Sequence, residues 1–187
     1  GSPVITEFMA DNNTALEDDQ GAFSDWIEIH NPDAKEVALG GWSLTDDPDD
    51  LQKWTFPSRA KLAPGAYMVV HASGLNLAGL FDNTYHTNFS LSSGGEYLAL
   101  VDPDGNVVQN FEESYPKQYL DVSYGSDGEL GGYFSRVTPG NANSGFTEPP
   151  VKKVDFSVDG KTFFDSSELE LTHEDPEVEI RYTLDGS

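Results

Sequence analysis

The chain has 187 residues, and 33 acidic against 10 basic side chains give a formal net charge of −23. An apolar fraction of 37%, with 12% aromatic residues, favours a folded core over disorder, and the length suits one domain or one domain and a shorter one. The excess of acid argues against nucleic acid and anionic membranes as partners, and no apolar run is long enough to span a bilayer.

Short runs of β-branched and aromatic residues, separated by glycine, proline, asparagine and aspartate, predict strands along the whole chain. In one of these runs Ile27 and Ile29 alternate with Glu28 and His30, which is the period of a half-buried strand. Gly105 can take the positive φ that a turn at 102–106 requires. No window has a convincing helical period. Strands are expected at Pro3–Phe8, Asp25–His30, Glu36–Leu39, Trp42–Thr45, Lys53–Phe56, Tyr67–Ala72, Tyr97–Val101, Val107–Glu112 and Val122–Gly125.

Strands at this spacing predict an all-β fold, an antiparallel sandwich or barrel. The pattern changes near 147–150, where Pro149-Pro150 favours a stiff extended connector. We therefore expect a first domain over 3–146, a linker over 147–150 and a truncated second β module over 151–187. Strand patterning restarts in that module at Val154–Val158, Glu168–Thr172 and Glu177–Thr183.

Several short motifs in residues 3–146 follow one another in an order that resembles the lamin tail domain, in particular its bacterial branch. The resemblance implies an immunoglobulin-like β-sandwich with no catalysis of its own, which in the family serves adhesion, display or partner binding. The motifs are Ile5–Phe8, Asp25–Ile29 with Asn31-Pro32, Leu39–Asp46, Lys53–Pro57, Leu62–Gly65, Thr87–Leu91, Gly94–Leu98 and Thr138–Asn141.

The end of the chain, Ile180–Ser187, resembles the start of the immunoglobulin-like module appended to chitobiase and β-hexosaminidase chains. That resemblance implies an exported multidomain bacterial protein, located outside the cell or on its surface. Gly1-Ser2 is typical of a cloning remnant, and the sequence stops within a strand-and-turn pattern. We therefore expect a piece of a longer protein, whose signal peptide is not part of this sequence.

The residues that usually carry catalysis do not form a recognisable pattern. Cysteine is absent, which excludes disulfides, thiolate catalysis and zinc sites built on sulfur. The four histidines lack the i, i+4 spacing of a helical metal pair, and no Gly-x-Ser-x-Gly motif occurs. The glycine-rich segment 92–95 leads into a strand, so it lacks the helix N-terminus that binds phosphate. The sequence therefore predicts that the chain is not an enzyme.

A metal site is the sharper hypothesis, because residues 17–25 concentrate the hard oxygen donors that calcium prefers. The candidate calcium ligands are Asp18, Asp19, Asp25 and Glu28. The segment does not fit an EF-hand, since Gly21 at the sixth position would place Leu16 at the first. The alternative, for this cluster and for a second one at 46–50, is a solvated acidic loop, with an Asx-type turn at Asp25. Because crowded carboxylates repel, modest acidification or salt should stabilise the fold.

The aromatic residues raise a second binding hypothesis. Trp26 has the opposite strand parity to Ile27, so it either faces outward or packs under a loop. Trp42 and Trp54 are expected in the core. A second group could form an exposed strip that stacks on sugar rings or a peptide, or could pin a loop over one end of the sandwich. Its members are Tyr115, Tyr119, Tyr124, Tyr133 and Phe134.

These observations together predict a non-catalytic structural or interaction module of a larger exported or surface bacterial protein, acting in anchoring, spacing or partner binding. Its partners would be neighbouring domains of the same chain and an unidentified protein or surface glycan. Two alternatives stay open: a carbohydrate-binding module, and the accessory domain of an enzyme whose catalytic domain lies elsewhere. Calcium is the one candidate cofactor.

Overall fold

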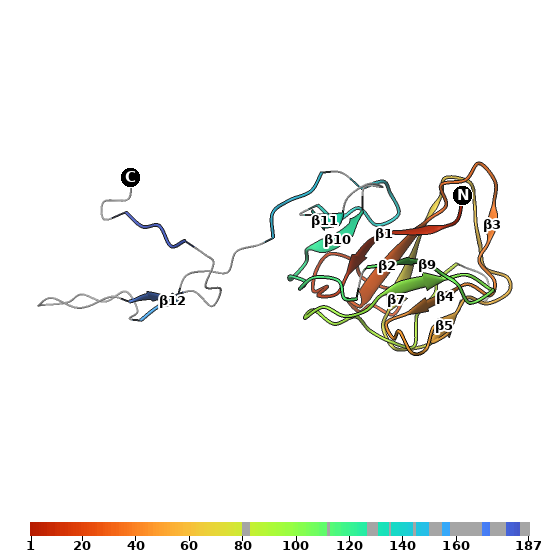
Figure 1. Cartoon of the computed structure of the whole chain (residues 1–187), viewed down its shortest axis with the longest axis horizontal. Helices are drawn as coiled ribbons and strands as arrows, with labels where there is room; N and C mark the ends of the chain where they lie inside the picture. Colours follow the sequence, from red (N-terminus) through yellow and green to blue (C-terminus); the bar gives the residue numbers. More distant parts are fainter. Residues whose placement is uncertain are drawn as a thin grey trace, which may run out of the picture. The chain divides into compact units, whose positions relative to one another are not determined.

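The computed structural model describes residues 1–79, 83–111, 113–126, 131–134, 136–143, 145–149, 155–157, 170–172 and 179–183. The chain divides into two units, Gly1–Pro149 and Pro150–Ser187 (Figure 1). Within the described ranges no helix is long and apolar enough to cross a membrane. The strands are β1 (Val4–Met9), β2 (Asp25–His30), β3 (Val37–Ala38), β4 (Ser43–Thr45), β5 (Trp54–Thr55), β6 (Lys61–Leu62), β7 (Tyr67–Ala72), β8 (Ala99–Val101), β9 (Val107–Asn110), β10 (Ser123–Ser126), β11 (Gly131–Phe134), β12 (Asp155–Phe156) and β13 (Leu171–Thr172).

The first unit is an antiparallel β-sandwich (Figure 1). One sheet has the order β11-β10-β1-β2-β7 and the other has the order β5-β4-β8-β9, while β3 and β6 form a short separate pair. Apolar side chains from both sheets form one buried cluster, which includes Ile5, Ile27, Leu44 and Leu100. The prediction of an all-β, immunoglobulin-like sandwich is therefore confirmed, and hydrophobic alternation is its physical basis.

Strand β1 carries a bulge that lets two core residues three positions apart point the same way. Ile5 pairs with Ile29, but the next partners are Glu7 and Glu28, so the register shifts at Thr6. Ile5 and Phe8 are consequently both buried in the core. The side chain of Gln109 on β9 then links the two sheets, because its Oε1 accepts from Ile5 N at 2.6 Å and its Nε2 donates to Ile5 O at 2.9 Å.

Strand β2 is buried on both faces, although its alternation predicts one solvent-facing side. Ile27 and Ile29 lie in the core, yet Trp26 and Glu28 are also 0% exposed. Other segments cover this second face: the amide of Gly140 reaches Glu28 at 2.7 Å. Of the two alternatives for Trp26, outward-facing or packed under a loop, the structure therefore supports the second, because the side chain is covered by other parts of the chain. Trp42 and Trp54 lie in the core, as predicted.

The observed strands follow the expected ones, with two additions. β2 and β7 have the predicted bounds, most others are shorter, and β6 and β11 were not expected. Gly131-Gly132 gives β11 little strand propensity. A Cβ on Gly132 would lie 2.4 Å from the ring of Phe146, so a larger residue there would displace that ring. The 102–106 turn forms as predicted, with Gly105 at φ +86°.

In the second unit, β12 and β13 pair antiparallel, with Asp155 opposite Thr172. These strands overlap the expected runs at 154–158 and 168–172, of which residues 154, 158, 168 and 169 lie outside the described residues. The third expected run is described only over 179–183, which contains no strand. The assignment of this unit to a chitobiase-type module stays a prediction.

Candidate functional site

The first predicted cluster, at 17–25, is a loop organised around Asp18. The Asp18 carboxylate is buried and accepts three hydrogen bonds, from the amides of Gln20 and Ala22 at 2.9 and 3.0 Å and from Ser24 Oγ at 2.6 Å. Burial alone would raise the pKa of Asp18, but these hydrogen bonds lower it below its ordinary value. Asp18 therefore acts on its own loop, and the Asx-type turn expected at Asp25 forms at Asp18 instead.

Asp19 joins this loop to a second segment of the chain. Its Oδ1 lies 2.6 Å from Nε2 of the buried His86, and His86 Nδ1 lies 2.9 Å from Ser73 Oγ. The hydrogen bond with His86 lowers the pKa of Asp19. Ser73 Oγ also accepts from Leu75 N at 3.2 Å. This Asp-His-Ser row was missed in the sequence, because its members are 13 and 67 residues apart and follow no motif spacing. It fastens three segments together.

Asp25 and Glu28 lie on opposite faces of β2, because they are three residues apart on one strand. Asp25 accepts from Leu91 N at 3.0 Å, and burial raises the pKa of Asp25 to about 6. The four predicted calcium ligands are therefore not brought together: Asp18 and Asp19 share a loop, while Glu28 belongs to a different cluster. In the described part of the chain, no three acidic or histidine side chains form a group suited to a metal ion. Calcium binding stays a prediction.

Glu28 instead pairs with Glu7, its direct cross-strand partner on β1. Both side chains are 0% exposed. Thr6 Oγ1 donates to Glu28 at 2.6 Å, and Ser123 Oγ donates to Glu7. Burial raises the pKa of Glu28 to about 7, the charge of Glu7 adds to the shift, and burial raises the pKa of Glu7 as well. The two carboxylates thus lie on the same face of the sheet, and each accepts a hydrogen bond from a hydroxyl group on a neighbouring strand.

Further donors come from the segment 138–143, which we call the exit segment because it precedes the end of the first unit. Thr138 Oγ1 donates to Glu7 Oε2 at 2.9 Å, and Gly140 N donates to Glu28 Oε2 at 2.7 Å. Asn143 Nδ2 donates to the carbonyl of Thr6 at 2.7 Å. Gly140 has φ +81°, a conformation that favours glycine. Residues about 130 positions apart thus meet over one face of the sheet.

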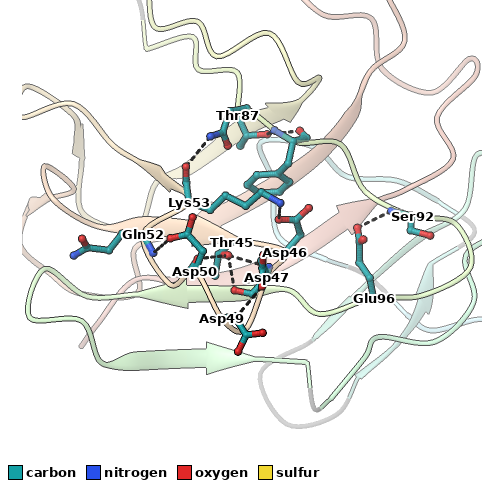
Figure 2. Close-up of polar contacts among 12 residues, drawn as sticks. Thr45, Asp46, Asp47, Asp49, Asp50, Gln52, Lys53, Thr87, Ser92 and Glu96 are labelled. Carbon is teal, nitrogen blue, oxygen red and sulfur yellow. Dashed lines mark hydrogen bonds and ion pairs between the residues drawn. The ribbon is translucent and has the colours of Figure 1, made fainter.

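The second acidic cluster, at 46–50, is a turn built on Thr45, whose Oγ1 donates within the loop and accepts from Asp47 N at 2.9 Å (Figure 2). Lys53 Nζ lies 2.6 Å from Asp46 Oδ1 and 5.7 Å from the centre of the Phe89 ring. Glu96 accepts from Ser92 N at 2.7 Å, and burial raises its pKa (Figure 2). Hydrogen bonds within the turn and the ion pair between Lys53 and Asp46 therefore explain the conformation of this acidic loop.

The aromatic residues expected as a strip do not share one exposed surface. Tyr115 and Phe134 are buried, and Tyr115 OH donates to Ser92 O at 2.9 Å. The half-buried Tyr119, Tyr124 and Tyr133 pack edge to face, with ring centres 5.0 and 5.5 Å apart. The edge of one ring therefore covers the face of the next, an arrangement that favours the pinned loop and not a flat surface for stacking.

The family model of the lamin tail domain matches residues 1–114. No curated protein matches the chain. The matched region contains both Glu7 and Glu28, whereas Ser123 and the exit segment, which donate to them, lie beyond it.

Proposed function

The chain belongs to the lamin tail domain family, and on that premise we propose that it is a non-catalytic module that anchors, spaces or presents neighbouring parts of a larger protein. The observation that carries this proposal is the use of its buried polar groups. Glu7, Glu28 and Asp18 each accept several hydrogen bonds from the chain itself. Buried carboxylates that accept hydrogen bonds from their own chain connect parts of a scaffold, and their oxygens are not free to act on a substrate.

The setting we propose is an exported or surface bacterial protein, with the second unit as the start of a chitobiase-type module. Its support is the resemblance of the motifs in 3–146 and of Ile180–Ser187 to modules of such proteins. Two features of the chain are compatible with that setting. The net charge of −23 keeps the chain soluble and repels anionic polymers. The exit segment fixes the course of the chain close to where the first unit gives way to the second, as a spacer requires.

The carbohydrate-binding alternative rested on an outward Trp26 or an open aromatic strip. Trp26 is 0% exposed, and the tyrosines pack on one another. Neither feature offers the free aromatic face on which a sugar ring stacks. The accessory-domain alternative differs from our proposal only in what lies beyond the chain, and the full-length neighbouring sequence distinguishes the two.

The proposal is tested by adding a panel of soluble oligosaccharides, chitooligosaccharides among them, to residues 1–187 and measuring the melting temperature and hydrolysis products. We expect no change in melting temperature and no product. A concentration-dependent rise would favour the carbohydrate-binding alternative, and a product would make the chain an enzyme. A binding-competent control lectin in the same plate confirms that the sugars are active.

A further inference from the structure

The exit segment joins the end of the first unit directly to its first strand. Thr138 binds Glu7 through its hydroxyl and its backbone amide, and Asn143 binds the Thr6 carbonyl. Thr6 and Glu7 belong to β1, which begins at Val4. The contacts therefore connect the two ends of the unit across a side-chain bridge, while residues 8–137 form the loop that this bridge closes.

This topology determines where tension would pass if the chain were pulled from its two ends. Tension entering at β1 reaches Thr6 and Glu7, crosses to Thr138 and Asn143, and leaves toward residue 149. Some partners inside 8–137 share this load, because Val4 and Ile5 pair with β2, Ile5 binds Gln109, and Gly140 binds Glu28. The rest of residues 8–137 lies outside that path while the bridge holds. The hydrogen bond from Thr147 N to Tyr133 O, at 2.8 Å, lies between the bridge and the C-terminal end of the unit. On the C-terminal side this bond would be the first to break.

The bridge is built to resist rupture better than an exposed contact. Glu7 is fully buried, and hydrogen bonds to charged acceptors are stronger than those between neutral groups. Gly140 adds a bond to Glu28 on β2, so the segment is held by two neighbouring strands. A Cβ on Gly125 would lie 2.0 Å from the Thr6 carbonyl, so β10 approaches β1 closely beside the same contacts.

We propose that the exit segment is a mechanical tie, which carries tension from the C-terminal side of the first unit to β1 and to its neighbour β2. The tie shields the rest of residues 8–137 from load. This inference rests on the proposed function, since a module that spaces its neighbours is pulled through them. A tie of this kind would keep the sandwich folded under load until the bridge itself breaks.

Single-molecule pulling tests the tie. Residues 1–187 are placed between two reference domains of known unfolding force and stretched from both ends. We expect early extension of the second unit and of the contact at Thr147, then release of ~130 residues in one step, a gain of about 45 nm at ~3.5 Å per residue. In Thr138→Val and Glu7→Gln, the rate of this step at fixed load should rise about tenfold or more. Thr138→Val removes the hydroxyl donor, and Glu7→Gln removes the charge and one of the two acceptor oxygens.

Asp121→Asn is the matched control. Asp121 accepts from the amides of Asn13 and Thr14 at 2.8 Å, so it also closes a long loop, but all of its partners lie within the shielded residues. We expect D121N to lower the melting temperature without changing the rate of the long step. Melting curves of T138V and E7Q show whether each variant is folded before it is pulled.

A second pulling direction completes the experiment. The chain has no cysteine, so Ala34→Cys and Asp104→Cys give two unique attachment points in exposed turns within the shielded region. Along this direction T138V should unfold at the same force as the parent. The tie is refuted if T138V and E7Q behave as the parent when pulled from the ends, or if residues 8–137 unfold before the bridge breaks. Oligosaccharide binding by the same sample would instead contradict the proposed function and leave the tie unaffected.

Discussion

Glu7 on β1 and Glu28 on β2 stand directly opposite each other, fully buried, on the face of the sheet that does not form the core. Two like charges in that position destabilise each other unless donors surround them or one of them takes up a proton. Here Thr6, Ser123, Thr138 and Gly140 supply the donors. Burial also raises the pKa of both carboxyls, so each binds a proton at a higher pH than a free carboxyl does.

The raised pKa values predict that the fold is more stable at pH 5 than at pH 8. Glu28 has a pKa of about 7 when folded, against an ordinary 4.5, and Asp25 about 6 against 3.8. Between these limits Glu28 and Asp25 bind more protons in the folded state than in the unfolded state, so their contribution to stability is lost as pH rises through the folded pKa values. Burial lowers the pKa of His71 and His30, which offsets part of this gain at acid pH. We expect the free energy of unfolding to increase by about 2 kcal/mol on acidification from pH 8 to 5.

The control for this pH profile is Glu28→Gln, which should flatten much of it. Below about pH 4 stability should fall again, because the lowered pKa of Asp18 belongs to a carboxylate that must be protonated in deep acid. A melting temperature that fell steadily from pH 7 to pH 5 would show that the acids are individually paired as carboxylates, contrary to the environment described for Glu28.

Asp18 should matter far more to stability than other aspartates of the acidic loops. Asp18→Ala leaves the amides of Gln20 and Ala22 and the Ser24 hydroxyl without their acceptor, at a cost of about 2 kcal/mol. The exposed Asp49 serves as the matched control, and Asp49→Ala should change stability by less than ~0.5 kcal/mol. Urea unfolding with an unchanged m-value measures both. Equal effects would contradict the role assigned to Asp18.

The sequence suggests calcium binding, but the positions of the four candidate ligands lead us to expect the same melting temperature in calcium and in EDTA. The oxygens of Asp18 already accept protein donors, and Asp25 and Glu28 face opposite sides of β2, so no single ion contacts all four predicted ligands. Binding at a hundredfold excess over Kd would add about 2.7 kcal/mol. A rise of that size in millimolar calcium, abolished by Asp19→Asn, would establish a site in the 17–25 loop after all.

The three tryptophans should report a buried environment. Trp26, Trp42 and Trp54 are exposed by 0, 9 and 5%, so the uncharged quencher acrylamide should barely quench native fluorescence and should quench the urea-unfolded chain strongly. Oligosaccharides should not change the native emission, because no tryptophan face is open to a sugar. Strong native quenching that a sugar relieves would restore the carbohydrate-binding alternative. Trp26→Phe identifies which residue responds.

Hydrophobic alternation was sufficient to locate most of the sandwich. Asp25–His30 and Tyr67–Ala72 have the predicted bounds because they are six-residue strands with clear apolar partners. β6 has only two residues, and β11 begins with two glycines, so neither gives a local signal. The alternation of apolar and polar residues therefore predicts the sandwich, but it does not predict the short strands β6 and β11.

The carboxylate pair was beyond sequence reasoning for a different reason. Glu28 occupies the polar parity of an alternating strand, which indicates a solvent-facing side chain. The Glu28 carboxylate is covered by Gly140, which lies 112 residues later and donates a hydrogen bond to it. The Glu7 carboxylate accepts a hydrogen bond from Thr138, which lies 131 residues later. The residue types in Thr138–Asn141 do not indicate which strands this segment covers. Contacts of this range are set by the tertiary fold, and the same holds for Asp19 and His86.

Hydrogen exchange at the backbone amides of Thr138 and Gly140 tests the central claim most directly, since both amides donate to the buried carboxylates. We expect these two amides in the intact chain to exchange as slowly as amides of β1, at rates set by unfolding of the whole unit. Exchange at the rate of an unstructured peptide, with β1 still protected, would show that the exit segment is not fastened to Glu7 and Glu28.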